Sequence, residues 1–339
     1  MEEAMRTEIL RLLRQTKQGD YISGQELCEQ LGISRTAVWK SINQLKEMGY
    51  EIEAVKNKGY CLVSVPDILS ESEVESCLNT KWLGHSVCYF DEIDSTNTQA
   101  KRIAEDTEGI NGHGIVVVAD MQTAGRGRRG RNWTSPHGTG IFFTILLKPQ
   151  IDPSRAPMLT LVKALAVAQG IREVTGLDAR IKWPNDIVVN GKKVVGILTE
   201  MSAQVDYINH IVVGTGINVH QMEFPEEIAK TATSLDLELQ KEGKNIEISR
   251  ARLLGTVLEK FENYYEVYLQ TQDLSSLREE YDFLLINCGR KVRVLDPLGE
   301  FEGRALGIDK MGELLVEKEN SIVKVSSGEV SVRGIYGYV

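Results

Sequence analysis

Apolar residues recur at every third or fourth position in the first 50 residues, which predicts three short helices. The first helix has its apolar face at residues 9–13. The second is expected to begin after Ser23, because Ser23-Gly-Gln-Glu26 is a capping box that satisfies free N–H groups at a helix start. Ser34 is expected to cap the third helix, whose apolar stripe consists of Val38, Ile42, Leu45 and Met48.

Two short strands, at residues 50–55 and 60–63, follow and predict a hairpin that turns at Lys56-Asn-Lys-Gly59. Three helices and a hairpin indicate a winged helix-turn-helix over residues 1–65. Its candidate DNA-binding side chains lie on the polar face of the third helix and at the hairpin tip: Arg35, Thr36, Trp39, Lys40, Asn43, Lys56 and Lys58. Such a mixture suits phosphate and base-edge contacts, and a small packing domain without DNA contacts is the alternative.

A linker at Pro66-Asp-Ile-Leu-Ser70 leads into residues 70–282, where apolar runs and helical patterns alternate. A second capping box, Ser70-Glu-Ser-Glu73, opens this region. Strands are expected at residues 85–91, 114–119, 141–147, 179–189, 192–200 and 213–218, and helices at 98–104, 153–174, 246–269 and 274–281. Asn190-Gly191 is the clearest hairpin turn. The sequence therefore predicts a central α/β domain within an α+β protein of several domains.

From residue 283 the pattern changes to alternating strands separated by glycine turns. These strands are expected at residues 291–295, 301–308, 313–317, 321–325 and 330–332. They predict a small β-barrel of SH3-like size over residues 283–339. This barrel either stabilises the protein as a cap without chemistry or helps to close an active site.

Composition narrows the function classes. The chain has 339 residues, 39 of them Lys or Arg and 48 Asp or Glu, so its formal net charge is −9. Contacts with nucleic acid must therefore be local. Its five cysteines show no C-x-x-C spacing, which indicates reduced thiols, a cytoplasmic location and no metal cluster. No apolar run approaches a membrane span, and the acidic start lacks the pattern of a signal peptide.

The loop at residues 122–140 carries the strongest candidate chemistry. Four arginines alternate in it with three glycines: Arg126, Arg128, Arg129 and Arg131 with Gly125, Gly127 and Gly130. Glycine lets the backbone approach a ligand, and arginine supplies bidentate donors to phosphate or carboxylate. Trp133 at the end of the arginines suits a heterocycle. We therefore expect this segment, the arginine loop, to bind a small anionic ligand.

Three other interpretations of the arginine loop are open. Its glycines spell G-x-G-x-x-G, but a dinucleotide fingerprint must open a helix, and Trp133-Thr-Ser-Pro136 prevents one. The others are a basic patch for nucleic acid and a disordered loop without a role. Trp133 argues against the last of these.

Polar residues elsewhere could complete the same pocket. Ser95, Thr96 and Asn97 precede a helix, where they are either N-caps or ligand contacts. Gly196 lies inside a strand and is expected to mark the close approach of a ligand. Gly214-Thr-Gly-Ile-Asn218 ends another strand and could close the pocket.

The two arms of the Asn190-Gly191 hairpin carry a further set. Lys182 and Lys193 lie on opposite arms, beside Asn185 and Asp186. Ammonium, amide and carboxylate groups together suit phosphate, carboxylate and Mg²⁺.

Together these motifs resemble those of biotin–protein ligases that also repress biotin operons. The resemblance is carried by Ser95-Thr-Asn97, Gln122-Thr-Ala-Gly-Arg-Gly-Arg-Arg-Gly-Arg-Asn-Trp133, Lys182-Trp-Pro-Asn-Asp186, Lys193-Val-Val-Gly-Ile197, Gly214-Thr-Gly-Ile-Asn218 and Gly307-Ile-Asp-Lys310. With both terminal domains it covers essentially the whole chain. It implies a mixed sheet in a central ligase domain similar to that of class II synthetases.

The resemblance implies a two-step reaction with ATP and Mg²⁺. The carboxylate of biotin attacks the α-phosphorus of ATP and gives biotinyl-5′-AMP and pyrophosphate. A lysine of a biotin carboxyl carrier domain, in acetyl-CoA carboxylase or another biotin-dependent carboxylase, then attacks the mixed anhydride and releases AMP. The resemblance also implies dimerisation on ligand binding, operator DNA as a partner, and no membrane.

By position, the resemblance implies biotin contacts from Ser95, Thr96, Asn97, Gln122, Arg126, Gly127, Arg128 and Lys193. The candidate catalytic residues among them are Lys193, Arg126 and Arg128. The expected contacts with ATP or the adenylate are Gly125, Arg131, Trp133, Lys182, Asn185 and Asn218. Asp186 is the candidate ligand of Mg²⁺.

Two alternative functions are kept. One is a repressor that senses biotin or its adenylate through an inactive ligase domain; the intact Lys193, Asp186 and arginine loop disfavour it as the sole function. The other is a lipoate or octanoate ligase, a related class that typically lacks this loop and this N-terminal domain.

Overall fold

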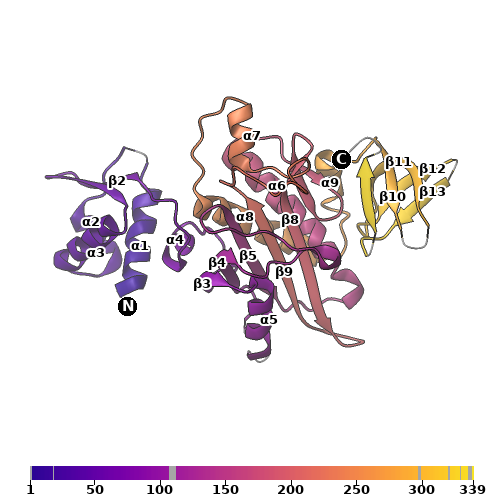
Figure 1. Cartoon of the computed structure of the whole chain (residues 1–339). Coiled ribbons are helices and arrows are strands. Elements are labelled where there is room, and N and C mark those ends of the chain that lie inside the picture. The colour runs from indigo at the N-terminus through magenta and orange to yellow at the C-terminus, as the bar shows by residue number, and fades with distance from the viewer. Residues whose placement is uncertain are drawn as a thin grey trace.

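The computed structural model describes residues 2–17, 19–106, 112–296, 299–319, 321–328, 330–334 and 338–339. An N-terminal helical unit, a central α/β unit and a C-terminal sheet follow one another along the molecule (Figure 1). No helix among these residues has the length and apolarity that crossing a bilayer requires. The domain boundaries near residues 65, 70 and 283 stay predictions.

The N-terminal unit contains the three helices and the hairpin expected from its pattern. They are α1 (Glu2–Gln15), α2 (Gly24–Leu31), α3 (Arg35–Glu47), β1 (Glu51–Val55) and β2 (Gly59–Ser64). Ser23 accepts a hydrogen bond from the Glu26 N–H at 3.0 Å, and Ser34 accepts one from Ala37 at 3.2 Å. Met48 lies beyond the end of α3 and is 38% exposed, so the apolar stripe stops at Leu45.

The central sheet has seven strands in the order β3-β4-β5-β9-β8-β7-β6. They are β3 (Val87–Ile93), β4 (Val116–Gln122), β5 (Gly140–Leu147), β6 (Arg180–Lys182), β7 (Asp186–Val189), β8 (Lys192–Ala203) and β9 (Ile208–Asn218). β3 and β4 are parallel, and the other neighbours are antiparallel. The expected mixed sheet is confirmed.

Helices cover both faces of this sheet (Figure 1). The helices of the central unit are α4 (Glu71–Ser76), α5 (Thr96–Asp106), α6 (Met158–Thr175), α7 (Leu235–Lys241), α8 (Arg250–Thr271) and α9 (Arg278–Leu284), with 3-10 turns at Arg128–Gly130 and Pro153–Arg155. α5 packs on one face through Ala100 and Ala104, and α6 and α8 pack together on the other.

Two expected elements are shorter than their patterns predicted. The strand at residues 179–189 is interrupted at Trp183-Pro184-Asn185, and its halves β6 and β7 pair with each other. Pro184 has no N–H to donate to a ladder, so the chain turns there instead of continuing. The helix expected from residue 153 begins at Met158, after a separate turn between Pro153 and Pro157.

The C-terminal unit is an antiparallel sheet of five strands in the order β13-β12-β11-β10-β14. They are β10 (Lys291–Leu295), β11 (Phe301–Ile308), β12 (Leu314–Lys318), β13 (Ser321–Val325) and β14 (Ser331–Gly334). Its apolar residues join the hydrophobic cluster of the central unit, whereas the N-terminal unit has its own. The C-terminal sheet is thus fixed beside the central sheet, where it can line a shared pocket.

One lysine of α6 is completely buried without an anionic neighbour. Lys163 is 0% exposed, and its Nζ lies 4.1 Å and 5.0 Å from the ring centroids of Phe143 and Phe261. Within the described part of the chain, Nζ has no hydrogen-bond partner. Burial lowers the pKa of Lys163 well below its usual value.

Replacing Lys163 with methionine is therefore expected to raise the free energy of unfolding at neutral pH by about 1–3 kcal/mol. The unfolded chain binds a proton that the folded chain releases, so the contribution of Lys163 to stability rises with pH towards the usual lysine pKa. Denaturant midpoints of both proteins, at about pH 7 and about pH 9.5, test this. The difference should shrink at the higher pH; a constant difference would mean that Lys163 is charged in the fold.

Candidate active site

Two adjoining pockets lie between the arginine loop, the central sheet and the C-terminal sheet. The larger has a volume of about 230 Å³ and the smaller about 50 Å³. Both are lined by Gly127, Arg128, Trp133, Asn185 and Lys193. The arginine loop, the Trp133 ring and the Lys193 ammonium group therefore lie where the two pockets adjoin.

The wall of the smaller pocket is a network of polar side chains at the start of α5. The Thr96 N–H and hydroxyl donate to Gln122 Oε1 at 2.9 Å and 3.1 Å. Thr144 Oγ1 on β5 lies within hydrogen-bond distance of both Thr96 Oγ1, at 2.8 Å, and Asn97 Oδ1, at 2.6 Å. Thr96 thus holds Gln122 instead of capping its helix, and the wall is rigid and polar.

A second layer behind this wall was not found from the sequence. The Asn97 amide donates to Glu200 Oε2 at 2.8 Å, and Lys101 forms an ion pair with Glu200 at 2.6 Å. The Lys101 ammonium and hydrogen bonds to the carboxylate hold the pKa of Glu200 below its usual value despite burial. In the sequence, Asn97 lies 103 positions and Lys101 lies 99 positions before Glu200, so no local pattern joins these residues.

The floor of the smaller pocket consists of glycines from neighbouring strands. Gly196 of β8 pairs with Gly216 of β9. A Cβ atom would come within 2.7 Å of the Trp133 ring at Gly196 and within 2.4 Å at Gly216. The close approach expected at Gly196 is therefore made by the indole of Trp133 in this structure.

The arginine loop folds back on itself through bridges between Gln122 and Ser135 and between Arg126 and Asn132. Its only helical turn is the 3-10 turn at Arg128–Gly130, so it does not open a helix as a dinucleotide fingerprint does. Arg126 donates to Thr98 of α5 at 2.6 Å. In this structure the loop lies across the mouth of both pockets.

Arg128 ties this loop to two other parts of the chain. One guanidinium nitrogen donates to Asn185 Oδ1 at 2.8 Å, and the other donates to the carbonyls of Ser327 and Gly328. The loop is thus joined to the C-terminal sheet.

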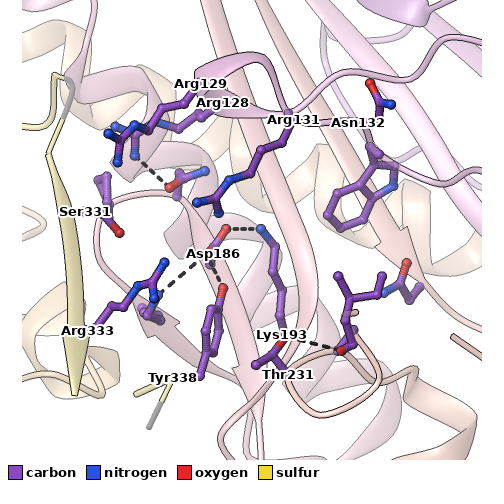
Figure 2. A pocket seen from close by; sticks show the side chains of 18 of the residues that line it. Arg128, Arg129, Arg131, Asn132, Asp186, Lys193, Thr231, Ser331, Arg333 and Tyr338 are labelled. Carbon is purple, nitrogen blue, oxygen red and sulfur yellow. Dashed lines mark hydrogen bonds and ion pairs between the residues drawn. The ribbon is translucent and has the colours of Figure 1, made fainter. Parts of the chain in front are cut away.

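The larger pocket is strongly cationic, and Figure 2 shows its charged side chains converging. Its lining includes Arg128, Arg129, Arg131, Lys182, Lys193 and Arg333. Burial lowers the pKa of Lys182 to about 8, against the opposing effect of Asp186.

Asp186 is the one carboxylate among the described lining residues of this pocket. Lys193 Nζ lies 2.5 Å from its Oδ1, and Lys182 Nζ lies 3.9 Å from its Oδ2. Burial alone would raise the pKa of Asp186, but the ammonium groups of Lys193 and Lys182 hold it below its usual value. Asp186 is therefore ionised in this pocket.

The expected site residues can now be placed. All eight expected biotin contacts line the smaller pocket: Ser95, Thr96, Asn97, Gln122, Arg126, Gly127, Arg128 and Lys193. The larger pocket contains Arg131, Trp133, Lys182, Asn185, Asp186 and Asn218. Gly125 lies in neither lining; a Cβ there would meet the Trp133 carbonyl at 2.5 Å, so it serves the loop's own packing. Sequence analysis missed Thr144, Glu200, Arg333 and Tyr338.

Among the expected DNA-binding residues, Arg35 of α3 and Lys56 and Lys58 of the hairpin line one shared groove. Arg35, Thr36, Trp39, Lys40, Lys56 and Lys58 are exposed, and Asn43 is half-buried. Trp39 is 61% exposed, so its ring is accessible from solvent.

Buried ion pairs join the N-terminal unit to the central one. Glu73 of α4 is completely buried and accepts hydrogen bonds from Arg14 of α1 and from the hydroxyl of Tyr50. In the linker, Asp67 accepts a hydrogen bond from Arg250 Nε at 2.6 Å. Arg250 also donates to Asp120 at the end of β4. The orientation of the helical unit is therefore set by specific charges.

A small polar pocket that opens into a cationic pocket is typical of enzymes that activate a carboxylate with a nucleotide. Joined to a helix-turn-helix, it defines the class of acid-activating ligases that carry a DNA-binding domain.

Comparisons with known proteins agree with this class. A model of the Biotin/lipoate A/B protein ligase family matches residues 89–218, an HTH domain model matches residues 6–61, and a Biotin protein ligase C terminal domain model matches residues 288–333. The chain is 41% identical over 334 residues to the Bifunctional ligase/repressor BirA of Bacillus subtilis (strain 168), covering 98% of this chain and 100% of that protein.

Two further relatives extend this. The Bifunctional ligase/repressor BirA of Escherichia coli (strain K12) is 31% identical over 324 residues, which cover 96% of this chain and 97% of that protein. The solved structure of biotin protein ligase from Aquifex aeolicus in complex with biotin and ATP has a TM-score of 0.62 and 32% identity, covering 74% of this chain and 99% of that one. The chain belongs to the biotin protein ligase family, and it has the ligase and repressor parts of the bifunctional members.

Proposed function

We propose that the smaller pocket binds biotin and the larger one binds ATP, so that the acid carboxylate meets the α-phosphate beside Lys193. The observation that carries this proposal is the junction of the two pockets, where Arg128, Trp133, Asn185 and Lys193 belong to both. Adenylation joins two anions, so cations are needed where the carboxylate and the phosphate approach each other.

The polar wall and the glycine floor support biotin as the acid. A bicyclic urea needs several fixed donors and acceptors, which Thr96, Asn97 and Gln122 offer from one rigid network. The smaller pocket holds only about 50 Å³, close to the space of two water molecules. Trp133 must therefore move away from Gly196 and Gly216 when the acid enters, and in its new place it can stack on the adenine.

The chemistry then follows in two steps. The carboxylate oxygen of biotin forms a bond to the α-phosphorus, and the bond to the β-phosphate oxygen breaks as pyrophosphate leaves. Lys193 and the arginine loop stabilise the negative charge that develops in this step. In the second step a carrier lysine attacks the acyl carbon, and AMP leaves. The loop protects the anhydride from water in between.

Mg²⁺ is proposed to accompany ATP, and the residues present fit it. Mg²⁺ is usually held by one or two carboxylates together with substrate phosphates, and Asp186 is an ionised carboxylate within the cationic pocket. When bound, the metal ion neutralises phosphate charge. Asp186 would hold it, while Lys182 and Lys193 keep this carboxylate ionised.

Replacing Arg128 with glycine is expected to speed the release of biotinyl-5′-AMP. Arg128 connects the arginine loop to Asn185 and to the carbonyls of Ser327 and Gly328. Hydrogen bonds from a charged group contribute about 1.5–3 kcal/mol each, so release should become at least about tenfold faster. Arg128→Lys keeps the charge but not the fork, and its release rate should lie between those of the other two proteins. Equal release by all three would refute the clamp.

The repressor function is proposed to use a ligand-induced homodimer. Two winged helices in a dimer match a palindromic operator, and the modest local charge of the N-terminal unit needs such help. The partners in the cytoplasm would be operator DNA and the biotin carboxyl carrier domains of acetyl-CoA carboxylase and related carboxylases. The SH3-like closure of the C-terminal sheet also stays a proposal.

Operator binding is accordingly expected to tighten when biotin and ATP are both added. Ligand orders the arginine loop, favours the dimer and thereby pairs the two recognition helices. Footprinting at fixed protein and salt concentrations, with each ligand alone as a control, measures this effect. Identical footprints with and without both ligands would contradict the proposed corepressor role.

A further inference from the structure

One aromatic side chain in the larger pocket comes from the segment that follows β14. The hydroxyl of Tyr338 donates to Asp186 Oδ2 at 2.5 Å, and the Nζ of Lys182 lies 3.7 Å from the centroid of its ring. Figure 2 shows the phenol pointing at Asp186 from the side opposite the arginine loop. None of the steps described above uses this residue.

The residues around Tyr338 fix it to the strands that carry the reaction's charged groups. A Cβ at Gly334 of β14 would lie 2.0 Å from the Val339 carbonyl oxygen, so Val339 packs directly on that glycine. A Cβ at Gly191, in the turn between β7 and β8, would lie 3.2 Å from a Val339 methyl group. β7 carries Asp186 and β8 carries Lys193. These contacts of Val339 hold the neighbouring Tyr338 close to the strands that carry Asp186 and Lys193.

The two oxygens of Asp186 have different partners. Oδ1 is paired with the Lys193 ammonium, and Oδ2 accepts the phenol hydrogen bond. In this contact the Tyr338 hydroxyl is the donor, because a carboxylate oxygen can only accept. A carboxylate oxygen has two lone pairs, so it can accept this hydrogen bond and bind a cation at the same time.

We propose that Tyr338 is a positioning residue that orients the Asp186 carboxylate for the divalent cation that accompanies ATP. Metal-bound carboxylates are commonly held by such outer hydrogen bonds, and their removal weakens metal affinity about 10- to 100-fold. The ring also lies against Lys182, whose Nζ is 3.7 Å from the ring centroid. The proposal rests on the assignment of Asp186 to the metal in the proposed function.

The test measures metal binding, not turnover. Free Mn²⁺, used in place of Mg²⁺, is titrated by electron paramagnetic resonance into the full chain with a non-hydrolysable ATP analogue. Tyr338→Phe removes only the hydroxyl and is expected to weaken Mn²⁺ binding about 10- to 100-fold. Biotin binding, measured by calorimetry, should be unchanged. Tyr264→Phe is the matched control. Tyr264 of α8 also donates to a carboxylate, that of Glu280 on α9, at 2.5 Å.

The outcomes separate this proposal from the function on which it rests. If Asp186→Asn weakens Mn²⁺ binding and Tyr338→Phe does not, the role of Tyr338 is refuted while the metal assignment stands. Unchanged Mn²⁺ binding by Asp186→Asn refutes the metal assignment itself, and the role of Tyr338 with it. Tighter binding by Tyr338→Phe would show that the phenol obstructs the site. Equal losses of Mn²⁺ and biotin binding by Tyr338→Phe would show a purely structural role for Tyr338. Either tighter Mn²⁺ binding or such equal losses would overturn the proposal.

Discussion

Replacing Lys193 with alanine is expected to remove most adenylate formation while leaving the fold intact. Lys193 is the only lysine that lines both pockets among the described residues. Its backbone is held by hydrogen bonds with Thr231 and Thr233, which the substitution preserves. Losing a hydrogen-bonded charge at the reacting atoms costs about 1.5–3 kcal/mol, or roughly 10- to 100-fold in rate.

The neighbouring lysine provides the matched control. Lys192 lies on the same strand but donates to the Ala229 carbonyl at 3.3 Å and lines neither pocket. Lys192→Ala should therefore adenylate biotin at the wild-type rate. Rapid quench of a single turnover measures the chemical step in all three proteins. A wild-type rate in Lys193→Ala would remove this residue from the mechanism.

Replacing Arg14 with methionine is expected to release the N-terminal unit from the central one. The substitution keeps the apolar stem but removes the cation from Glu73, whose side chain is 0% exposed. Removing one partner of a buried ion pair costs about 3–5 kcal/mol. Since Arg14 lies on α1 and Glu73 on α4, the loss falls on the contact between the two units.

Small-angle scattering and hydrogen exchange in the linker at residues 66–70 detect this release. The variant should expand and exchange faster in the linker, while biotin binding by the central unit is retained. Arg11→Met on the same helix is the control, because the ion pair of Arg11 in the described part of the chain is with half-exposed Glu8 at 3.3 Å. If Arg14→Met stays as compact as the control, the ion pair does not set the orientation of the units.

Elements with a local signal were predicted from the sequence. The caps at Ser23, Ser34 and Ser70 are present because each motif satisfies its own backbone N–H groups within four residues. β10 and β11 match their patterns because alternate residues of each strand are buried. β13 also has the expected bounds, although Val325 is the one buried residue in it. The prediction of one continuous strand at residues 179–189 was wrong, because the chain turns at Pro184 within this apolar run. Trp183 in this turn donates hydrogen bonds to Asn287 and to the Gly312 carbonyl, which belong to distant segments.

The residues of the candidate site also fall into two groups, those with a local signal in the sequence and those without one. Residues within dense motifs, such as Thr96, Gln122 and Lys193, lie around the two pockets, and their roles stay predictions. Thr144, Glu200 and Tyr338 reach the site only because the sheet and the C-terminal segment bring distant residues together. A single threonine in an apolar strand, or a tyrosine among glycines, carries no local signal of such contacts. Only the tertiary structure reveals them.

Exchange of labelled pyrophosphate into ATP tests the central claim most directly. It reports the reversible formation of the acyl-adenylate without a carrier protein, and lipoate serves as the control acid. With Mg²⁺ present, exchange with biotin and none with lipoate is the expected result. No exchange with either acid, in folded protein, would contradict the account and leave a repressor that senses its ligand through an inactive ligase domain.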